Sequence, residues 1–230
     1  MIECNVIRAI DIFFSLVILS VLIPVLMPIV FILKFTGEGE IFYLQERVGL
    51  QGKKFNIIKF ATMLKNSSNI GNKNITLKND PRVLKFGKFL RKTKINELPQ
   101  LLNVVLGDMS LVGPRPLTQD HFEIYTLEAR QKISQIRPGI TGLGSIVFRD
   151  EETMLSNATD PKSKYQNIIS PQKSNLELWY IQNKSIKLYF LLILLTAVTI
   201  FFKKNILLKF FIKKIPDLSL SLEDDKDFSL

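Results

Sequence analysis

Apolar residues are densest near the N-terminus, where no ionisable residue occurs between Asp11 and Lys34. The run is close to the roughly 20 residues that a helix needs to cross the hydrocarbon core of a bilayer. Pro24 and Pro28 interrupt it, and each removes a backbone donor and favours a kink. Basic residues flank both ends, so the positive-inside rule assigns no orientation. We predict over 1–35 a re-entrant membrane helix that breaks at Pro24, with a kinked single-span anchor as the alternative.

A second, shorter apolar stretch covers residues 188–202, and the segment KKNILLKFFIKK follows it. Lysines interleaved with apolar residues are typical of a helix in the headgroup region, where ammonium groups reach anionic lipid. We expect 188–215 to form amphipathic helices on the membrane surface; a buried core helix with a solvated basic face is the alternative. The acidic residues 216–230 are expected to be a disordered tail.

Between these regions, residues 36–187 carry the shorter patterns of one small, mainly helical α/β domain. The segments 41–49 and 53–63 predict two short strands joined by a Gly-containing turn. The polar residues 66–79 lack periodicity and predict a loop. Three segments have the apolar spacing of helices: 82–90, 97–106 and 122–135. The Gly- and Pro-punctuated segment 107–116 is expected to be mostly non-helical.

Composition narrows the class of partner. Hydrophobic residues make up 47% of the chain, and the formal charge of +10 requires an anionic partner such as nucleic acid, a phosphorylated small molecule or an acidic membrane. Many lysines lie beside apolar stretches and no nucleic-acid motif occurs, so we do not expect a nucleic-acid partner. Cys4 is the only cysteine, which excludes an internal disulfide framework. His121 is the only histidine, which excludes a metal site built from several histidines.

Guanidinium groups gather in the segment 80–137, at Arg82, Arg91, Arg115 and Arg137. Arg115 stands between Pro114 and Pro116, whose fixed φ angles stiffen its backbone. A planar fork held in this way suits bidentate capture of a phosphate or diphosphate. The alternative is a surface arginine in a rigid turn.

The segment INELPQLLNVV supplies an acid beside these arginines. Asn96 is a good helix N-cap, Glu97 falls in the first turn, and Pro99 is tolerated there. This structural explanation alone accounts for all three residues. A helix N-terminus also offers N–H groups to an anion, and a carboxylate there can hold Mg²⁺ together with substrate phosphates. The second hypothesis is therefore a shared diphosphate–metal site of Glu97 and the arginines.

Six motifs occur in one order: QERVG at 45–49, KFATM at 59–63, DPR at 80–82, LRKTKINELPQLLNV at 90–104, GDMSLVGPRP at 107–116 and RPGITG at 137–142. Together they resemble the bacterial sugar transferase family, the monotopic phosphoglycosyl transferases that initiate glycoconjugate assembly. The resemblance covers roughly residues 8–142. A single motif would be weak, but six in the right order make chance similarity improbable.

The resemblance implies a re-entrant helix broken near Pro24, with both ends on the cytoplasmic side of the bacterial inner membrane. It also implies a ping-pong reaction, in which an aspartate attacks the β-phosphate of a UDP-sugar, UMP leaves, and polyprenyl (undecaprenyl) phosphate takes the phosphosugar. Glu97 would bind Mg²⁺. The product would start a cell-surface glycan, such as a capsule or lipopolysaccharide, for downstream glycosyltransferases. The implied phosphate-binding residues are Lys59, Arg82, Arg91, Arg115 and Arg137.

Two positions depart from the family pattern. The nucleophilic aspartate of the family is replaced by Asn96, whose amide is not a competent nucleophile, and Ala61 stands where the family usually has arginine. Three explanations remain: another acid is the nucleophile, the transfer is direct, or the chain is a catalytically silent membrane scaffold. The candidate substitute acids are Asp108, Asp120, Asp150, Glu151 and Glu152.

The segment GSIVFRDEETML contains three of these acids. We predict a short strand over 145–148 that delivers Arg149 and the acids to one place. One explanation is a strand-to-helix turn with Asp150 as cap and Glu151 and Glu152 in the first helical turn. The other is that these residues shape the catalytic pocket and offset the loss at position 96.

Overall fold

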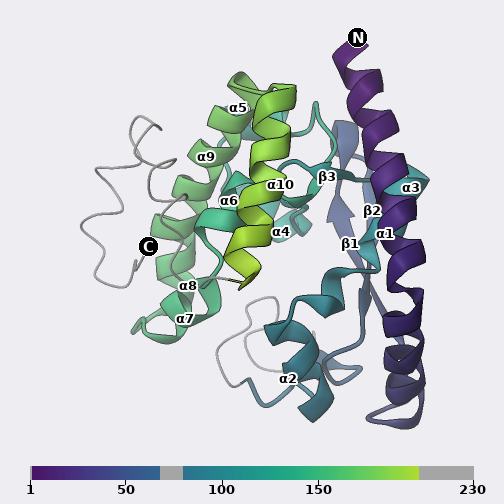
Figure 1. Ribbon diagram of the computed structural model, residues 1–230. Coiled ribbons are helices and arrows are strands. Elements are labelled where there is room, and N and C mark those ends of the chain that lie inside the picture. Colours follow the sequence, from purple (N-terminus) through teal and green to yellow (C-terminus); the bar gives the residue numbers. More distant parts are fainter. Residues whose placement is uncertain (1, 68–79, 202–230) are drawn as a thin grey trace.

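The computed structural model describes residues 2–67 and 80–201 (Figure 1). Most of the predicted loop 66–79, the basic part of the predicted membrane-surface region 188–215 and the acidic tail 216–230 lie outside the described residues. Within them, the chain is mostly helical with short strands, as the sequence predicts.

The helix α1, Ile2–Phe35, runs along one side of the molecule (Figure 1). It continues through Pro24 and Pro28, so the structure does not confirm the break predicted at Pro24. A proline removes one backbone hydrogen bond but does not force the chain to reverse, and apolar residues favour helix on both sides of it. Among the described residues, α1 is the one helix long and apolar enough to cross a membrane, and only 11% of its most apolar window is buried.

Polar residues fasten the first third of α1 to the rest of the protein. The buried carboxylate of Asp11 accepts the backbone N–H of Leu111 at 2.9 Å and the hydroxyl of Tyr189 at 2.6 Å. Arg8 donates to the carbonyl of Val105 at 3.1 Å. A buried carboxylate is tolerated only when such donors satisfy it, so these contacts fix how α1 is seated.

The predicted hairpin is present. β1 (Phe42–Val48) and β2 (Lys54–Phe60) pair antiparallel through the turn Leu50–Gly52. Asn103 accepts the backbone N–H of Ile58 at 2.9 Å and donates to the carbonyl of Asn56 at 2.8 Å. This buried side chain therefore holds the hairpin against the helix that carries Asn103.

The two helices predicted at 82–90 and 97–106 are confirmed with later starts. They are α2, Lys85–Lys92, and α3, Gln100–Leu106. Between them Lys94 adopts a left-handed φ of 60° and a separate 3₁₀ turn, Ile95–Glu97, follows. Pro99 occupies the N-cap of α3, so the N-cap role predicted for Asn96 is wrong. The left-handed residue redirects the chain before Asn96, and the helix can start only at the proline.

Two short parallel strands, β3 (Ser110–Val112) and β4 (Gly139–Thr141), lie at the centre of the molecule, as expected for a largely non-helical 107–116. Their ends approach so closely that a Cβ on Gly139 would lie 2.1 Å from the backbone nitrogen of Gly113. Glycine is required at this crossing because any side chain would push the two motifs apart.

The rest of the described chain is helical apart from these strands and their loops. The single helix predicted at 122–135 is two, α4 (Gln119–Ile124) and α5 (Leu127–Ile133), because Thr126 is extended and caps α5 by accepting the N–H of Ala129. The predicted strand 145–148 is wrong: it is helix α6, Leu143–Val147, whose apolar residues recur at helical spacing and are buried. The remaining helical elements are α7 (Glu151–Ser156), α8 (Pro161–Lys164), η4 (Tyr165–Ile169), α9 (Ser170–Gln182) and α10 (Ile186–Phe201).

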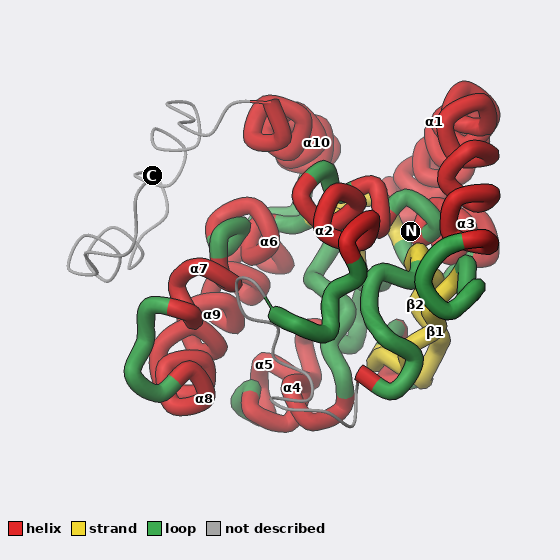
Figure 2. The backbone as a smooth tube through the Cα atoms, turned by 90° about the horizontal axis from the view of Figure 1, so that it is seen from below, coloured by secondary structure: helices red, strands yellow, loops and turns green. Residues whose placement is uncertain are grey.

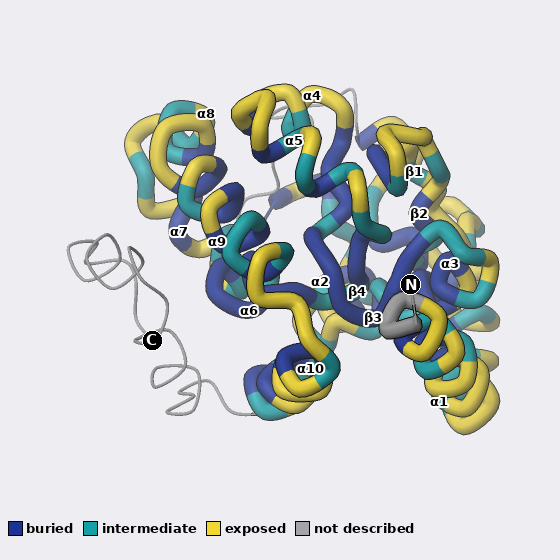
Figure 3. The backbone as a smooth tube through the Cα atoms, turned by 90° about the horizontal axis from the view of Figure 1, so that it is seen from above, coloured by how far each residue is buried: buried dark blue, intermediate teal, exposed yellow. Residues whose placement is uncertain are grey.

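The predicted C-terminal apolar segment begins as α10, and it has two different faces. Tyr189, Leu192 and Leu195 are buried in the main core, whereas Phe190 and Leu194 are about half exposed. Figures 2 and 3 show α1 and α10 on one side of the molecule, with much of their surface uncovered. One face of α10 thus agrees with the core-helix alternative, and contact of the other face with a membrane stays a prediction.

Candidate active site

Glu97 lies at the centre of the site. Its Oε1 is 3.1 Å from Nη2 of Arg115 and 3.4 Å from Nζ of Lys59. Lys59 is on β2, Glu97 in the 3₁₀ turn before α3, and Arg115 in the loop after β3. Three of the sequence motifs therefore meet, and the structure brings together the predicted Lys59, Glu97 and Arg115.

Arg47 joins this cluster from β1. It donates to the carbonyl of Pro116 at 3.2 Å and to the side chain of Gln45. The backbone N–H of Val48 donates to the carbonyl of Leu117 at 2.9 Å, so the hairpin is tied to the proline-flanked loop that carries Arg115. The sequence indicated QERVG as a motif but did not identify Arg47 as a site residue.

The cluster is electrostatically unbalanced in favour of an anion. Burial alone would raise the pKa of Glu97, but Lys59 and Arg115 outweigh it and hold that pKa well below its usual range. Burial lowers the pKa of Lys59 to about 8, and burial with the nearby charge of Arg115 lowers the pKa of Arg47 to about 10. Three crowded cations share the space with one paired carboxylate. A phosphate would relieve their repulsion.

Asn96 is beside this cluster and is unusual in itself. Only 6% of the residue is exposed, and its Oδ1 has no hydrogen-bond partner among the described residues. A buried amide oxygen without a protein partner is costly unless a water, an ion or a ligand satisfies it.

The other predicted arginines are placed elsewhere. Arg82 forms a buried ion pair with Asp80 at 2.6 Å, and Arg91 pairs with Glu152. Arg137 donates to the carbonyl of Gly107 at 2.9 Å. These contacts give all three a structural explanation, and their part in phosphate binding stays a prediction.

The acids predicted as substitute nucleophiles lie in different surroundings. Asp108 accepts from Asn103 at 3.3 Å, although it lies only seven positions before Arg115 in the chain. Asp120 and Asp150 are exposed, and the side chain of Glu152 is half exposed and paired with Arg91. Glu151 instead pairs with Lys173 at 2.5 Å. The pKa of Arg115 is raised mainly by Glu97, and the charge of Glu151 adds a smaller contribution.

Sequence reasoning missed Lys173 and Glu177, both buried on α9. The backbone N–H groups of Arg115 and Gly144 face the Glu177 carboxyl, yet burial dominates and raises its pKa to about 8. The only signal was a lysine and a glutamate four residues apart on the helix face that also carries Leu176 and Tyr180. Charged residues on a buried face are rare unless they are paired or functional.

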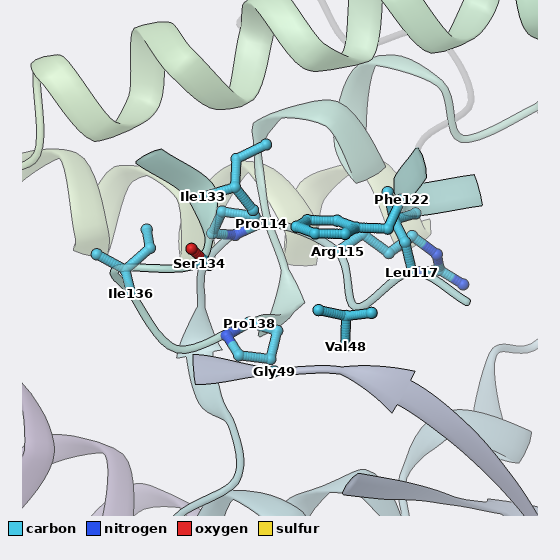
Figure 4. Close-up of a pocket in the computed structure, with 10 residues that line it drawn as sticks. All are labelled: Val48, Gly49, Pro114, Arg115, Leu117, Phe122, Ile133, Ser134, Ile136 and Pro138. Carbon is cyan, nitrogen blue, oxygen red and sulfur yellow. The ribbon is translucent and has the colours of Figure 1, made fainter. Parts of the chain in front are cut away.

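A small hollow lies behind the Arg115 loop, and Figure 4 shows its lining. Val48, Phe122, Ile133 and Pro138 make most of this lining apolar, and the guanidinium of Arg115 points away from Ile136 and Ser134. An apolar lining does not suit a phosphate. We therefore propose that a phosphate would bind at the Arg115 guanidinium near Glu97, outside this hollow.

Residues 2–203 match the family model described as "Bacterial sugar transferase". This chain belongs to the bacterial sugar transferase family. The match extends the resemblance seen in the motifs through α9 and α10, which contain no motif that sequence reasoning used.

Named relatives agree with this membership. The chain is 35% identical to a UDP-glucose:undecaprenyl-phosphate glucose-1-phosphate transferase of Klebsiella pneumoniae, over 85% of this chain and 40% of that protein. It is 39% identical to the uncharacterized sugar transferase EpsL of Bacillus subtilis, over 68% of each chain. An uncharacterized sugar transferase of Haemophilus influenzae is 36% identical, over 78% of this chain and 37% of its own length. The chain thus spans about two fifths of the Klebsiella and Haemophilus proteins.

Proposed function

We propose that the protein transfers a sugar 1-phosphate from a UDP-sugar to undecaprenyl phosphate, releases UMP, and so begins a cell-surface glycan. The observation that carries the proposal is the cluster of Lys59, Arg47 and Arg115 around Glu97, three cations that can bind a diphosphate next to one carboxylate. Relatives named for this reaction, and the family membership, support it.

Mg²⁺ is the metal we propose for this reaction. Among the described residues no three acids, histidines or cysteines gather as a metal site, and Glu97 contributes one carboxylate. That donor set fits Mg²⁺, which is commonly held by one or two carboxylates and by the oxygens of substrate phosphates. Bound there, the ion would neutralise charge on the phosphoryl group.

We further propose that α1 embeds the protein in the inner membrane with the site on the cytoplasmic side. The exposed apolar surface of α1, and the uncovered face of α10, support membrane contact. The re-entrant path stays a hypothesis. It requires α1 to bend at Pro24 or Pro28 when its apolar residues are surrounded by lipid.

A panel of UDP-sugars, with UMP release measured in the presence and absence of Mg²⁺ and undecaprenyl phosphate, tests the function. We expect release with at least one sugar. Glu97→Gln should lower it by about 100-fold or more, the usual range for losing one preorganised charge. Glu128→Gln is the matched control, because Glu128 pairs only with exposed Lys132 on α5.

A silent scaffold is the second candidate, and Asn96 is the observation that favours it. In that case wild-type protein would bind a UDP-sugar without releasing UMP, and Asn96→Asp would gain release. Release by the wild type excludes the scaffold.

A further inference from the structure

A covalent route for the proposed transfer needs a carboxylate that Asn96 does not supply, and the structure narrows the choice among the described acids. The acid must lie within electrostatic reach of Arg115, be held in place by a cation, and remain open to substrate. The inference that follows rests on the proposed function.

Most described acids near the site fail one of these conditions. Glu97 pairs with Arg115 itself and with Lys59, and it is the carboxylate proposed for Mg²⁺. Among the described residues, Asp108 accepts from the amide of Asn103 rather than from a cation. Glu177 is adjacent to Arg115, but only 3% of it is exposed. Its carboxyl is also enclosed by backbone: a Cβ on Gly144 would lie 2.6 Å from Glu177 Oε1. No substrate phosphorus can approach a carboxyl enclosed in this way.

Glu151 meets all three conditions. Its carboxylate is 2.5 Å from Lys173 Nζ, and a quarter of its side chain is exposed. Lys173 is itself buried, with its ammonium 5.6 Å from the ring centre of Phe148 and 5.9 Å from that of Tyr165. A lysine fixed in this way limits the rotamers of Glu151. Lys173 and Glu177 both border Gly144, and Glu177 faces the backbone N–H of Arg115, so this pair lies next to the Arg115 loop. The charge of Glu97 and, to a lesser extent, that of Glu151 raise the pKa of Arg115.

We propose that Glu151 is the carboxylate nucleophile of this protein, with Lys173 as the residue that positions it. An oxygen of Glu151 attacks the β-phosphorus of the UDP-sugar and forms an acyl phosphate. The bond from that phosphorus to the bridging oxygen breaks, and the electron pair leaves with UMP. An oxygen of polyprenyl phosphate then attacks the same phosphorus, and the acyl-phosphate bond breaks to restore the carboxylate.

The direct test is to trap the intermediate on unmodified protein. Wild-type enzyme is mixed with the active UDP-sugar, labelled in its β-phosphate, without polyprenyl phosphate, and quenched. We expect one UMP per protein and the label on a tryptic peptide covering 150–162, with fragmentation placing it on Glu151. Label on any other residue, or turnover with no labelled protein, overturns the proposal.

Variants separate the chemistry from folding. Glu151→Gln should abolish the label and lower transfer by about 1,000-fold or more, as removal of a covalent nucleophile does. Glu151→Asp keeps the carboxylate and should label position 151 at a reduced rate. Thermal unfolding of each variant checks the fold. Full labelling of Glu151→Gln overturns the proposal even if its stability changes.

Lys173→Met tests the positioning role. It leaves the nucleophile in place, so we expect label still on Glu151, a lower kcat and little change in KM. An equal fall in labelling of the Glu128→Gln control would contradict a specific role for Lys173.

Failure of the two proposals looks different. No UMP release with any UDP-sugar overturns the proposed function, and the nucleophile assignment with it. UMP release without label on Glu151 overturns the nucleophile assignment alone.

Discussion

At the scale of single residues, the guanidinium of Arg115 interacts electrostatically with carboxylates from two separate parts of the chain. Glu97 contacts it at 3.1 Å, while Glu151 acts on it from a helix more than 30 residues later. Its flanking prolines restrict its backbone, while its guanidinium pairs with Glu97, and Glu151 remains paired with Lys173. A diphosphate that replaces one of these partners leaves the other in place.

Lys59 makes the site sensitive to alkaline pH. Its pKa is lowered to about 8, so it loses its proton as the pH rises through that value and binds phosphate less well above it. We expect kcat/KM for the UDP-sugar to fall above about pH 8. In Lys59→Arg the fall should move to higher pH, because arginine stays protonated. An unchanged alkaline limb in Lys59→Arg would assign the titration to another group.

Glu177 makes the free energy of unfolding depend on pH between about 4.5 and 8. Burial raises its pKa from 4.5 to about 8, so the folded state retains a proton that the unfolded state has lost. The associated stability is complete below pH 4.5 and is lost as the pH rises to about 8. Glu177→Gln, which cannot ionise, should melt at least about 3 °C above wild type at pH 8.5, the shift expected of about 1 kcal/mol. At pH 4.5 the two should melt alike, as followed by circular dichroism in detergent.

At the scale of elements, the hairpin and the 3₁₀ turn are placed by helix α3. Asn103 satisfies the backbone of β2 on both its donor and its acceptor side, and β2 carries Lys59 into the site. Local structure and catalytic geometry therefore depend on the same amide.

Asn103→Ala should leave the Ile58 N–H and Asn56 carbonyl without partners. We expect a loss of about 2–4 kcal/mol of unfolding free energy, measured by denaturant titration, since each unsatisfied buried group costs about 1–3 kcal/mol. UMP release should fall as well, because Lys59 is no longer held opposite Glu97. Leu102→Ala, a change at an exposed neighbour on the same helix, is the control and should cost much less.

The sequence predicts a helix or strand well where its apolar residues follow a clear period. It predicts poorly where tertiary contacts determine whether a segment is helix or strand. The hairpin alternates and is confirmed. The prediction of a strand at 145–148 was wrong because its β-branched residues, Ile146 and Val147, also fit the buried face of a short helix. Lys59, Glu97 and Arg115 could be found because each lies in a recognisable motif. Lys173 and Glu177 could not, since only the packing of α9 against the Arg115 loop gives them a role.

At the scale of the whole molecule, the first and the tenth helix form one unit with the catalytic core. α1 and α10 lie on the same side, α1 contacts β3 and α3, and α10 contacts both central strands. α1 is therefore built into the domain, and its removal would take away the hydrogen bonds from Arg8 to the carbonyls of Val105 and Met109.

Tyr189→Phe tests how much the hydrogen bond between α10 and α1 contributes to stability. It removes one of the two donors to buried Asp11 while keeping the ring. We expect a loss of about 1.5–3 kcal/mol, the range for a hydrogen bond to a charged group, seen as a lower melting temperature in detergent. UMP release at low temperature should remain near wild type, because the hydroxyl is remote from Glu97. Equal stability of the variant would show that Leu111 alone satisfies Asp11.

The same hydrogen bond sets an order of events in the cell. Asp11 and Tyr189 are 178 positions apart, so the ribosome delivers the buried carboxylate long before its phenol. Until Tyr189 has been made, Asp11 lacks one of its two donors. The seating of the first helix on the domain is therefore completed by one of the last helices that the structure describes.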